Sequence, residues 1–274
     1  MSEHTPGGIT TDGSKRVVVV GGVAGGMSAA TRLRRLDADA SIVVIERSGH
    51  VSYANCGLPY YAGGVITERE DLLLQTPERL HDRFRLDVRV QSEVVGIDRS
   101  ARTVTVRDLR TGREYAEPYD ALVLSTGASP FVPPLDGVER AVTLRTVEDV
   151  DRITASLVDT GTAVIAGGGF IGVELAENLR HRGVDVTLVE LADQVLPPLD
   201  PELAVLLSDE LVGHGVDVRL GTAVSAIGAR DVTLSDGDVV PADLVVLAIG
   251  VRPDTRLARE AGLEIGPRGG IAVD

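Results

Sequence analysis

The stretch that decides the fold is RVVVVGGVAGG, at residues 16–26 of this 274-residue chain. Its four consecutive valines, Val17 to Val20, are typical of a strand that is buried on both faces. A glycine-rich turn follows at once, residues 27–36 have the pattern of an amphipathic helix, and a strand at residues 41–45 ends in Glu46. A strand, a glycine turn, a helix and a second strand ending in a carboxylate together form the βαβ unit that binds dinucleotides.

Each part of this unit has a physical role. Glycines let the backbone approach a pyrophosphate, the start of the helix directs N–H groups at the anion, and the carboxylate accepts hydrogen bonds from ribose hydroxyl groups. Val23 replaces the middle glycine of the usual Gly-x-Gly-x-x-Gly pattern. The strand before the loop and Glu46 after it nevertheless favour nucleotide binding over a generic glycine-rich turn. The candidate cofactor-binding residues of this loop are Gly21, Gly22, Ala24, Gly25, Gly26, Glu46 and Arg47.

The same pattern returns in the second half of the chain. Residues 166–172 read AGGGFIG and satisfy Gly-x-Gly-x-x-Gly in full, and a strand at residues 184–189 leads to Glu190. Gly167 lies 146 residues after Gly21 and Glu190 lies 144 residues after Glu46, so the two cores run in step. The candidate cofactor-binding residues of the second unit are Gly167, Gly169, Phe170, Ile171, Gly172, Glu190 and Gly250.

The two units differ in length. Their closing strands end at Gly127 and Gly250, which are only 123 residues apart. The first unit therefore carries roughly twenty extra residues beyond the shared repeat. Alternating segments at residues 86–97, 103–109 and 114–119 predict strands, and residues 68–84 read as helix interrupted at Pro77.

We expect an α/β fold with two Rossmann-like dinucleotide-binding units, each with a β-meander insertion. The predicted domains are a disordered leader at 1–14, a first unit at 15–145 that carries the cysteine, a second unit at 146–255, and the start of a return to the first domain at 256–274. The polar leader lacks the apolar run of a secretory signal, and no segment is long enough to span a membrane.

The extra residues of the first unit contain VSYANCGLPYYAGG at 51–64, with Cys56 as the only cysteine of the chain. Most free cysteines are small buried hydrophobic residues. Here, however, the thiol follows a nucleotide loop, Asn55 offers an amide, Gly57 allows close approach and Pro59 suits the first turn of a helix. We therefore favour a redox or nucleophilic thiol.

Composition narrows the possible partners. The formal net charge of −14 argues against nucleic acid or an anionic membrane as a general partner. One cysteine excludes an intramolecular disulfide, so nothing demands an oxidising compartment, and we expect a cytoplasmic protein. No metal site is predicted.

The cysteine segment and the preceding glycine loop resemble the single-cysteine branch of the pyridine nucleotide-disulfide oxidoreductases, and within it the coenzyme A-disulfide reductases. The resemblance implies FAD in the first unit and NADH or NADPH in the second, with hydride passing through the flavin to a disulfide that involves Cys56. It also implies that Thr126, Gly127 and Asn55 contact the cofactor. Glu190 favours NADH because a carboxylate repels a 2′-phosphate, although Arg180 or Arg182 could offset it.

The resemblance leaves two kinds of chemistry open for Cys56. In a coenzyme A-disulfide reductase the cysteine forms a mixed disulfide with coenzyme A, whereas oxidases and peroxidases use a sulfenic acid. The latter branch has a histidine in the first glycine loop, where this chain has Ala24, so the coenzyme A or persulfide branch is favoured.

The coenzyme A contacts implied by position are Ser28, Arg32, Arg35, Ser52 and Asn55. A solvated helix face is the alternative for the helix arginines, and we prefer it for Arg34. A basic residue that the family has after the next helix falls on Phe84 here, between Arg83 and Arg85.

The chain stops at Asp274, where the family continues into a second FAD motif and a C-terminal domain that forms the homodimer. We therefore expect a truncated, monomeric chain with weak FAD binding and an intact pyridine nucleotide site. The alternative from another class is a non-catalytic nucleotide-binding fragment, which would be colourless instead of yellow.

Overall fold

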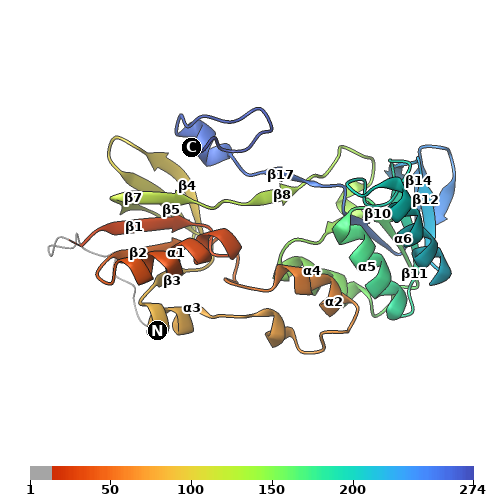
Figure 1. Ribbon diagram of the computed structural model, residues 1–274, viewed down its shortest axis with the longest axis horizontal. Coiled ribbons are helices and arrows are strands. Elements are labelled where there is room, and N and C mark those ends of the chain that lie inside the picture. Colours follow the sequence, from red (N-terminus) through yellow and green to blue (C-terminus); the bar gives the residue numbers. More distant parts are fainter. Residues whose placement is uncertain (1–13) are drawn as a thin grey trace. The chain divides into compact units, whose positions relative to one another are not determined.

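The computed structural model describes residues 14–274, so the expected leader lies outside the described residues except for Ser14 (Figure 1). The chain divides into two compact units. The first comprises residues 14–52, Gln75–Gly127 and Asp254–Asp274, and the second comprises Tyr53–Leu74 and Ala128–Pro253. These bounds differ from the expected ones, because the cysteine-bearing residues 53–74 pack with the second unit.

The first unit is built on a parallel four-stranded sheet of order β3-β2-β1-β7. Its strands are β1 (Arg16–Val20), β2 (Ser41–Ile45), β3 (Asp87–Arg89) and β7 (Ala121–Leu124). Helices α1 (Ala24–Leu36) and α3 (Pro77–Phe84) cover one face, where Val17 and Val19 lie in one core with Met27 and Leu80. The valines of β1 alternate between two cores, which explains why a strand buried on both faces reads as an unbroken apolar run.

The other face of this sheet is covered by an antiparallel meander. It consists of β4 (Ser92–Asp98), β5 (Thr103–Asp108) and β6 (Glu114–Pro118). Val18 and Val20 share a core with Val104 and Val106 of β5 and with Leu257 of α7 (Arg256–Glu260).

The second unit repeats this plan around a parallel sheet of order β12-β11-β10-β16-β9. The strands are β9 (Ala141–Thr143), β10 (Thr162–Ala166), β11 (Asp185–Glu190), β12 (Asp217–Leu220) and β16 (Leu244–Leu247). The principal helices are α4 (Val147–Ser156), α5 (Phe170–His181) and α6 (Pro201–Gly213). The predicted capping box at the start of α4 is present, since Thr146 and Asp149 each accept a hydrogen bond from the other's backbone N–H.

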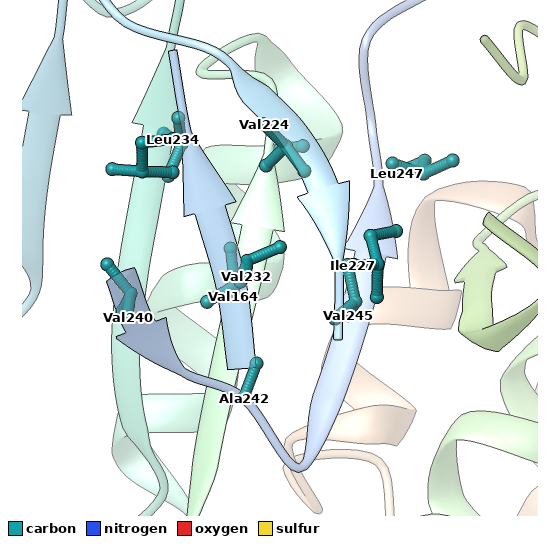
Figure 2. Close-up of a cluster of buried hydrophobic side chains, with 11 residues drawn as sticks. Val164, Val224, Ile227, Val232, Leu234, Val240, Ala242, Val245 and Leu247 are labelled. Atoms are coloured by element: carbon teal, nitrogen blue, oxygen red, sulfur yellow. The ribbon is translucent and has the colours of Figure 1, made fainter. Parts of the chain in front are cut away.

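A second meander covers one face of this sheet. It consists of β13 (Val224–Ile227), β14 (Asp231–Leu234) and β15 (Val239–Pro241). Figure 2 shows Val164 and Val245 of the parallel sheet against Val232 and Leu234 of the meander. The expected α/β fold with two Rossmann-like units and two meander insertions is thus confirmed.

A two-stranded antiparallel ribbon was not expected. It pairs β8 (Ala128–Pro130), which follows Gly127, with β17 (Val251–Pro253), which follows Gly250. The Arg252 guanidinium lies 4.0 Å from the ring centroid of Phe131, a cation–π contact. Two strands that leave equivalent positions of the repeat therefore pair with each other.

One expected strand is divided in the structure, and the expected interruption of a helix at Pro77 is present. Residues 86–97 form β3 in the parallel sheet and β4 in the meander, with a break at Gln91, whose φ of 51° no strand accommodates. Residues 68–84 form a short 3₁₀ helix, η2 (Arg69–Leu72), and α3, because Pro77 begins a new helix behind the Thr76 cap.

The repeat extends further than the glycine loops. Ser52 and Leu196, 144 residues apart, both have positive φ (49° and 45°), and their N–H groups donate to the carbonyls of Gly22 and Gly168 at 3.0 and 2.8 Å. Only four residues (197–200) then lead to the proline that starts α6, whereas 24 residues (53–76) lead to Pro77 of α3. The extra residues of the first repeat are therefore the stretch between Ser52 and Pro77.

Buried and partly buried charges support both units. In the first, Arg89 donates to Glu117 (2.6 Å) and to the Tyr115 hydroxyl (3.0 Å), and also pairs with Asp87. Burial opposes the charge of Arg89, but the two carboxylates raise its pKa above the ordinary value.

In the second unit, Asp243 binds the start of β10 and Arg230. Its carboxylate accepts from the Arg230 guanidinium at 3.1 Å and from the Thr162 hydroxyl at 3.0 Å. These donors, with the N–H groups of Thr162 and Gly161, lower the pKa of Asp243 to about 2.

Candidate functional site

The first glycine loop has the backbone geometry of a dinucleotide loop. Gly21 has a φ of +100°, and a Cβ there would lie 2.2 Å from the carbonyl oxygen of Ser125. A Cβ at Gly26 would lie 1.8 Å from the carbonyl oxygen of Gly21, so α1 can begin against the loop only without a side chain at that position. By contrast, Ala24 and Gly25 are exposed, as a ligand-facing turn requires.

The second loop repeats this geometry. Gly167 has a φ of +110°, with a Cβ position 2.4 Å from the Ala248 carbonyl oxygen. A Cβ at Gly172 would lie 1.9 Å from the carbonyl oxygen of Gly167, whereas a Cβ at Gly169 would meet nothing within 4 Å. The open space beside Gly169 at the start of α5 fits the approach of a pyrophosphate.

The departure at Val23 now has a physical reason. Val23 and Gly169 occupy the same place in the repeat, as the N-cap residues of α1 and α5, and both have negative φ (−101° and −78°). A side chain is therefore allowed at this position by the backbone, unlike at Gly21 or Gly26.

The two carboxylates at the strand ends hold the loops as well as facing the expected ribose sites. Glu46 accepts from the N–H of Gly22 at 2.7 Å and from Ser48 at 2.8 Å. Glu190 likewise accepts from Gly168 at 2.6 Å and from Ala192 at 2.8 Å. Each carboxylate oxygen has a second lone pair that remains available for a ribose hydroxyl group.

Neither Arg180 nor Arg182, the two arginines that the sequence left open as partners of Glu190, is placed to offset its charge. Arg180 binds the Val184 carbonyl and Asp185 at the first residue of β11, and Arg182 binds the carbonyl of Ala62. Glu190 lies at the other end of β11, about 16 Å away at the usual rise of a strand. The residue after it is the exposed Leu191, 71% accessible, which offers no charge to a 2′-phosphate.

Further residues near the second loop are apolar and exposed. Phe170 and Ile171 in the first turn of α5 are 63% and 37% accessible, and Ile249 before Gly250 is 39% accessible. Gly250 itself has a φ of +108° and no atom near its Cβ position. Exposed apolar side chains beside a glycine loop suit the flat rings of a nucleotide.

The remaining predicted contacts of the first unit fall into two groups. Thr126 donates through its hydroxyl to the carbonyl of Asp254, whose N–H donates to Gly127 at 3.0 Å, so the closing strand is tied to the returning chain. Arg47 lies 3.7 Å from the carboxylate of Asp254. These contacts organise the loop edge, and a cofactor contact by any of them stays a prediction.

The predicted coenzyme A residues of α1 share one exposed face. Ser28, Arg32 and Arg35 follow helical spacing and are all exposed. Arg34 does not form the solvated face that we preferred for it. It donates to the carbonyls of Phe84 and Ala38 (2.8 Å each), which closes the ends of α3 and α1.

Both arginines beside Phe84 also contact other residues of the first unit. Arg85 donates to the Ala38 carbonyl at 2.6 Å, and the guanidinium of Arg83 lies 5.1 Å from the centroid of the Phe84 ring. Ser52, the other predicted contact of the first unit, is the half-buried residue of positive φ that holds the loop.

Cys56 lies in the second unit, in the cysteine segment, by which we mean residues 53–74. It is exposed and occupies the short 3₁₀ helix η1 (Asn55–Gly57), directly before α2 (Leu58–Ala62). The segment lies against α4 and α5, which sequence reasoning missed because the contacting residues are about a hundred positions apart. The glycine pair Gly63-Gly64 was the one signal, since a buried glycine marks close approach.

The structure contains no helix, among residues 14–274, that is long and apolar enough to cross a membrane.

Two parallel-sheet units, each with a glycine loop, a carboxylate at the next strand end and a meander, define a protein with two dinucleotide sites of the FAD/NAD(P)-binding fold. A profile of the family described as pyridine nucleotide-disulphide oxidoreductase matches residues 15–274. The chain belongs to this family, whose members are FAD-dependent enzymes that bind NAD(P)H.

Known proteins agree with this assignment. The coenzyme A disulfide reductase of Staphylococcus aureus (strain JH9) is 34% identical over 263 residues, which are 94% of this chain and 59% of the relative. The reduced Bacillus anthracis CoADR-RHD matches with a TM-score of 0.91 at 50% identity, over 94% of this chain and 47% of that one. The NAD-dependent persulfide reductase from A. fulgidus matches with a TM-score of 0.91 at 41% identity, over 94% of this chain and 50% of that one. The chain thus spans about three fifths of the length of the curated relative.

Proposed function

We propose that this chain carries the NAD(P)H-dependent disulfide reductase chemistry of its family, with Cys56 as the reacting thiol and coenzyme A disulfide as the candidate substrate. The observation that carries the proposal is the exposed Cys56, the only cysteine of this sequence, in a segment inserted into the first of the two dinucleotide-binding repeats. Because this sequence has no second cysteine, we propose that the partner sulfur comes from outside it, from a small-molecule disulfide.

The two glycine loops fit the dinucleotides of the family. The first, with Glu46, would hold FAD, and the second, with Glu190, would hold the pyridine nucleotide. Bound FAD supplies acceptance of a hydride from NAD(P)H and delivery of two electrons to a sulfur acceptor. We propose NADH as the donor, because the carboxylate of Glu190 and the uncharged Leu191 offer nothing favourable to a 2′-phosphate.

Cys56 would exchange with the substrate in balanced steps. Its thiolate attacks a disulfide R–S–S–R, forming a Cys56–S–S–R bond and releasing RS⁻. Two electrons then break that bond and give the Cys56 thiolate and a second RS⁻, which a proton converts to thiol. The exposed face of Ser28, Arg32 and Arg35 would bind the phosphates of coenzyme A, since guanidinium groups pair with phosphate in bidentate geometry.

A persulfide substrate is the second candidate. The similarity to the A. fulgidus persulfide reductase, at 41% identity, supports it. The same thiol would take a sulfur atom from a persulfide, so comparing coenzyme A disulfide with coenzyme A persulfide as substrates separates the two. A sulfenic acid mechanism is less well supported, because the branch that uses one has a histidine in the first glycine loop, and the exposed Ala24 at that position has no acid–base group.

The proposal is tested with Cys56→Ser. This variant should lose disulfide reduction, because serine cannot form the mixed disulfide, while NADH binding stays within about twofold of wild type, a difference too small to mark a lost contact. Ser225→Ala, at an exposed serine of β13 in the meander, is the matched control. Disulfide reduction retained by Cys56→Ser would refute the assignment. An anaerobic NADH titration, followed by flavin absorbance, separates an enzyme from a non-catalytic fragment.

A further inference from the structure

The cysteine segment is closed at its base by backbone pairing. Tyr53 forms an antiparallel bridge with Leu73, and the N–H of Ala54 donates to the carbonyl of Leu72 at 2.8 Å. Between these points lies α2, a helix of only five residues. So short a helix is not stable alone in water, so contacts from elsewhere in the unit must fix its place.

One such contact is an ion pair between η2 of the segment and α4. The Arg69 guanidinium donates to both carboxylate oxygens of Asp151, with Nε–Oδ1 at 2.9 Å and Nη2–Oδ2 at 2.7 Å. This bidentate geometry is the strong form of an arginine–carboxylate pair, and hydrogen bonding to Asp151 raises the pKa of Arg69. The pair joins residues 82 positions apart in the sequence.

The second contact fixes the C-terminal end of α2 against the end of α5. Arg182 donates from Nη1 to the carbonyl of Ala62, the last residue of α2, at 2.8 Å. The next residue, Gly63, lies so close to Asn178 that a Cβ there would be 2.4 Å from its Oδ1 atom. Asn178 is 2% accessible and Ala62 is fully buried, so this part of the segment is embedded in the second unit.

We propose that Arg69 and Arg182 are positioning residues for Cys56, which lies in η1 between the closed base of the segment and α2. They do not contact the thiol; they hold the segment against α4 and α5 and thereby set where the thiol lies. Arg69 fixes η2 near the base of the segment, and Arg182 fixes the end of α2. The inference rests on the proposed function of Cys56. It gives two arginines of the second unit an indirect role in the reaction of this thiol, although the thiol belongs to the first repeat in sequence order.

The central test is the reversal of the ion pair. In Arg69→Ala, hydrogen exchange of the amides of Gly63, Val65 and Ile66, which bond within the segment, should rise about fivefold, equivalent to about 1 kcal/mol. Amides of β10 should not change. The double variant Arg69→Asp/Asp151→Arg should restore slow exchange, and Arg69→Lys, which keeps the charge without the bidentate geometry, should lie between.

The functional readout is the division between kcat and KM. In Arg69→Ala and in Arg182→Ala, kcat for disulfide reduction should fall, while the KM for the pyridine nucleotide, whose loop is intact, should not change. Arg219→Ala is the matched control, because Arg219 forms a partly exposed ion pair with Asp217 on β12, the edge strand of the second sheet, and its ion pairs in the structure are with Asp217 and Asp238, outside the segment.

The outcomes are distinct from those of the proposed function. Unchanged exchange in Arg69→Ala, or raised exchange that the reversed pair does not restore, overturns the positioning role even if Cys56 is the reacting thiol. Exchange does not require turnover, so a protein in which Cys56→Ser keeps its activity would refute the proposed function and leave the exchange result intact. A fall in kcat in Arg219→Ala equal to that in Arg69→Ala would also overturn the inference.

Discussion

Two glycines of the second loop, three positions apart, should respond in opposite ways to the addition of one methyl group. In Gly172→Ala the new Cβ would lie 1.9 Å from the carbonyl oxygen of Gly167, whereas in Gly169→Ala it would meet no atom within 4 Å. The first change is therefore a test of packing between α5 and the loop, and the second a test of ligand approach.

The magnitudes follow from these distances. To bring the Gly172 Cβ to even 3 Å, α5 must move by about 1 Å, and forcing atoms into a packed region costs about 1–3 kcal/mol. Alanine regains about 1 kcal/mol of helix propensity, so we expect a net loss of up to about 2 kcal/mol, or a fall in Tm of up to about 8 °C. Gly169 is the N-cap with a φ of −78°, which alanine adopts freely, so its variant should lose under about 1 kcal/mol.

Binding should separate the two positions further. The Cβ of Gly169→Ala would occupy the space that we assign to the pyrophosphate, so affinity for NADH should fall at least about tenfold, or about 1.4 kcal/mol, with stability nearly unchanged. Fluorescence titration with NADH and thermal unfolding measure the two effects on the same samples. Wild-type affinity in Gly169→Ala would refute the placement of the nucleotide, and a Tm raised above that of the wild type in Gly172→Ala would refute the packing argument.

Three further changes have defined outcomes. Glu190→Gln combined with Leu191→Arg should shift the ratio of NADPH to NADH use by roughly tenfold or more, because it removes a repelling charge and adds a phosphate partner; a ratio that stays at the wild-type value in steady-state kinetics would contradict this. Asp243→Asn should lower stability at neutral pH, and the difference from wild type should vanish as the pH falls from about 4, the ordinary pKa, toward the pKa of about 2 in the folded protein; a difference that persists in urea unfolding at pH 2 would exclude this cause. Arg89→Ala should lower the free energy of unfolding by about 3 kcal/mol, because the buried Glu117 loses the guanidinium that pairs with it. Arg89→Met combined with Glu117→Leu should recover most of this loss, and a double variant as unstable as Arg89→Ala would show that the loss comes from packing alone.

The parallel sheets and both glycine loops could be predicted because their determinants are local. The β-branched run at Val17 and the full glycine pattern at Gly167 each specify a strand and a turn within a dozen residues. The positions of the carboxylates Glu46 and Glu190, at the ends of β2 and β11, could also be predicted from their spacing to the glycine loops. The expected strand at residues 86–97 is wrong at Gln91, because no sequence pattern indicates the left-handed backbone of that residue.

The place of the cysteine segment could not be predicted, because no local pattern encodes its partners. The contacts of Arg69 with Asp151 and of Arg182 with Ala62 join positions far apart in the sequence, and each residue read alone is an ordinary charged surface residue. Gly63 gave a hint of close approach but not the identity of the neighbour, Asn178. Sequence order therefore assigned the segment to the first unit, whereas packing assigns it to the second.

This division between sequence order and packing has a consequence for synthesis on the ribosome. Ala62 leaves the ribosome 120 residues before Arg182, its partner on α5. At about 5–20 residues per second, the segment with its thiol waits about 6–24 s for the helices that bury Leu58 and Ala62. During that interval a free thiol and two apolar side chains are exposed on a nascent chain, open to oxidation and to chaperones. Slowing translation after Ala62 has emerged and before Arg182 emerges lengthens this exposure, whereas slowing it after Arg182 has emerged does not.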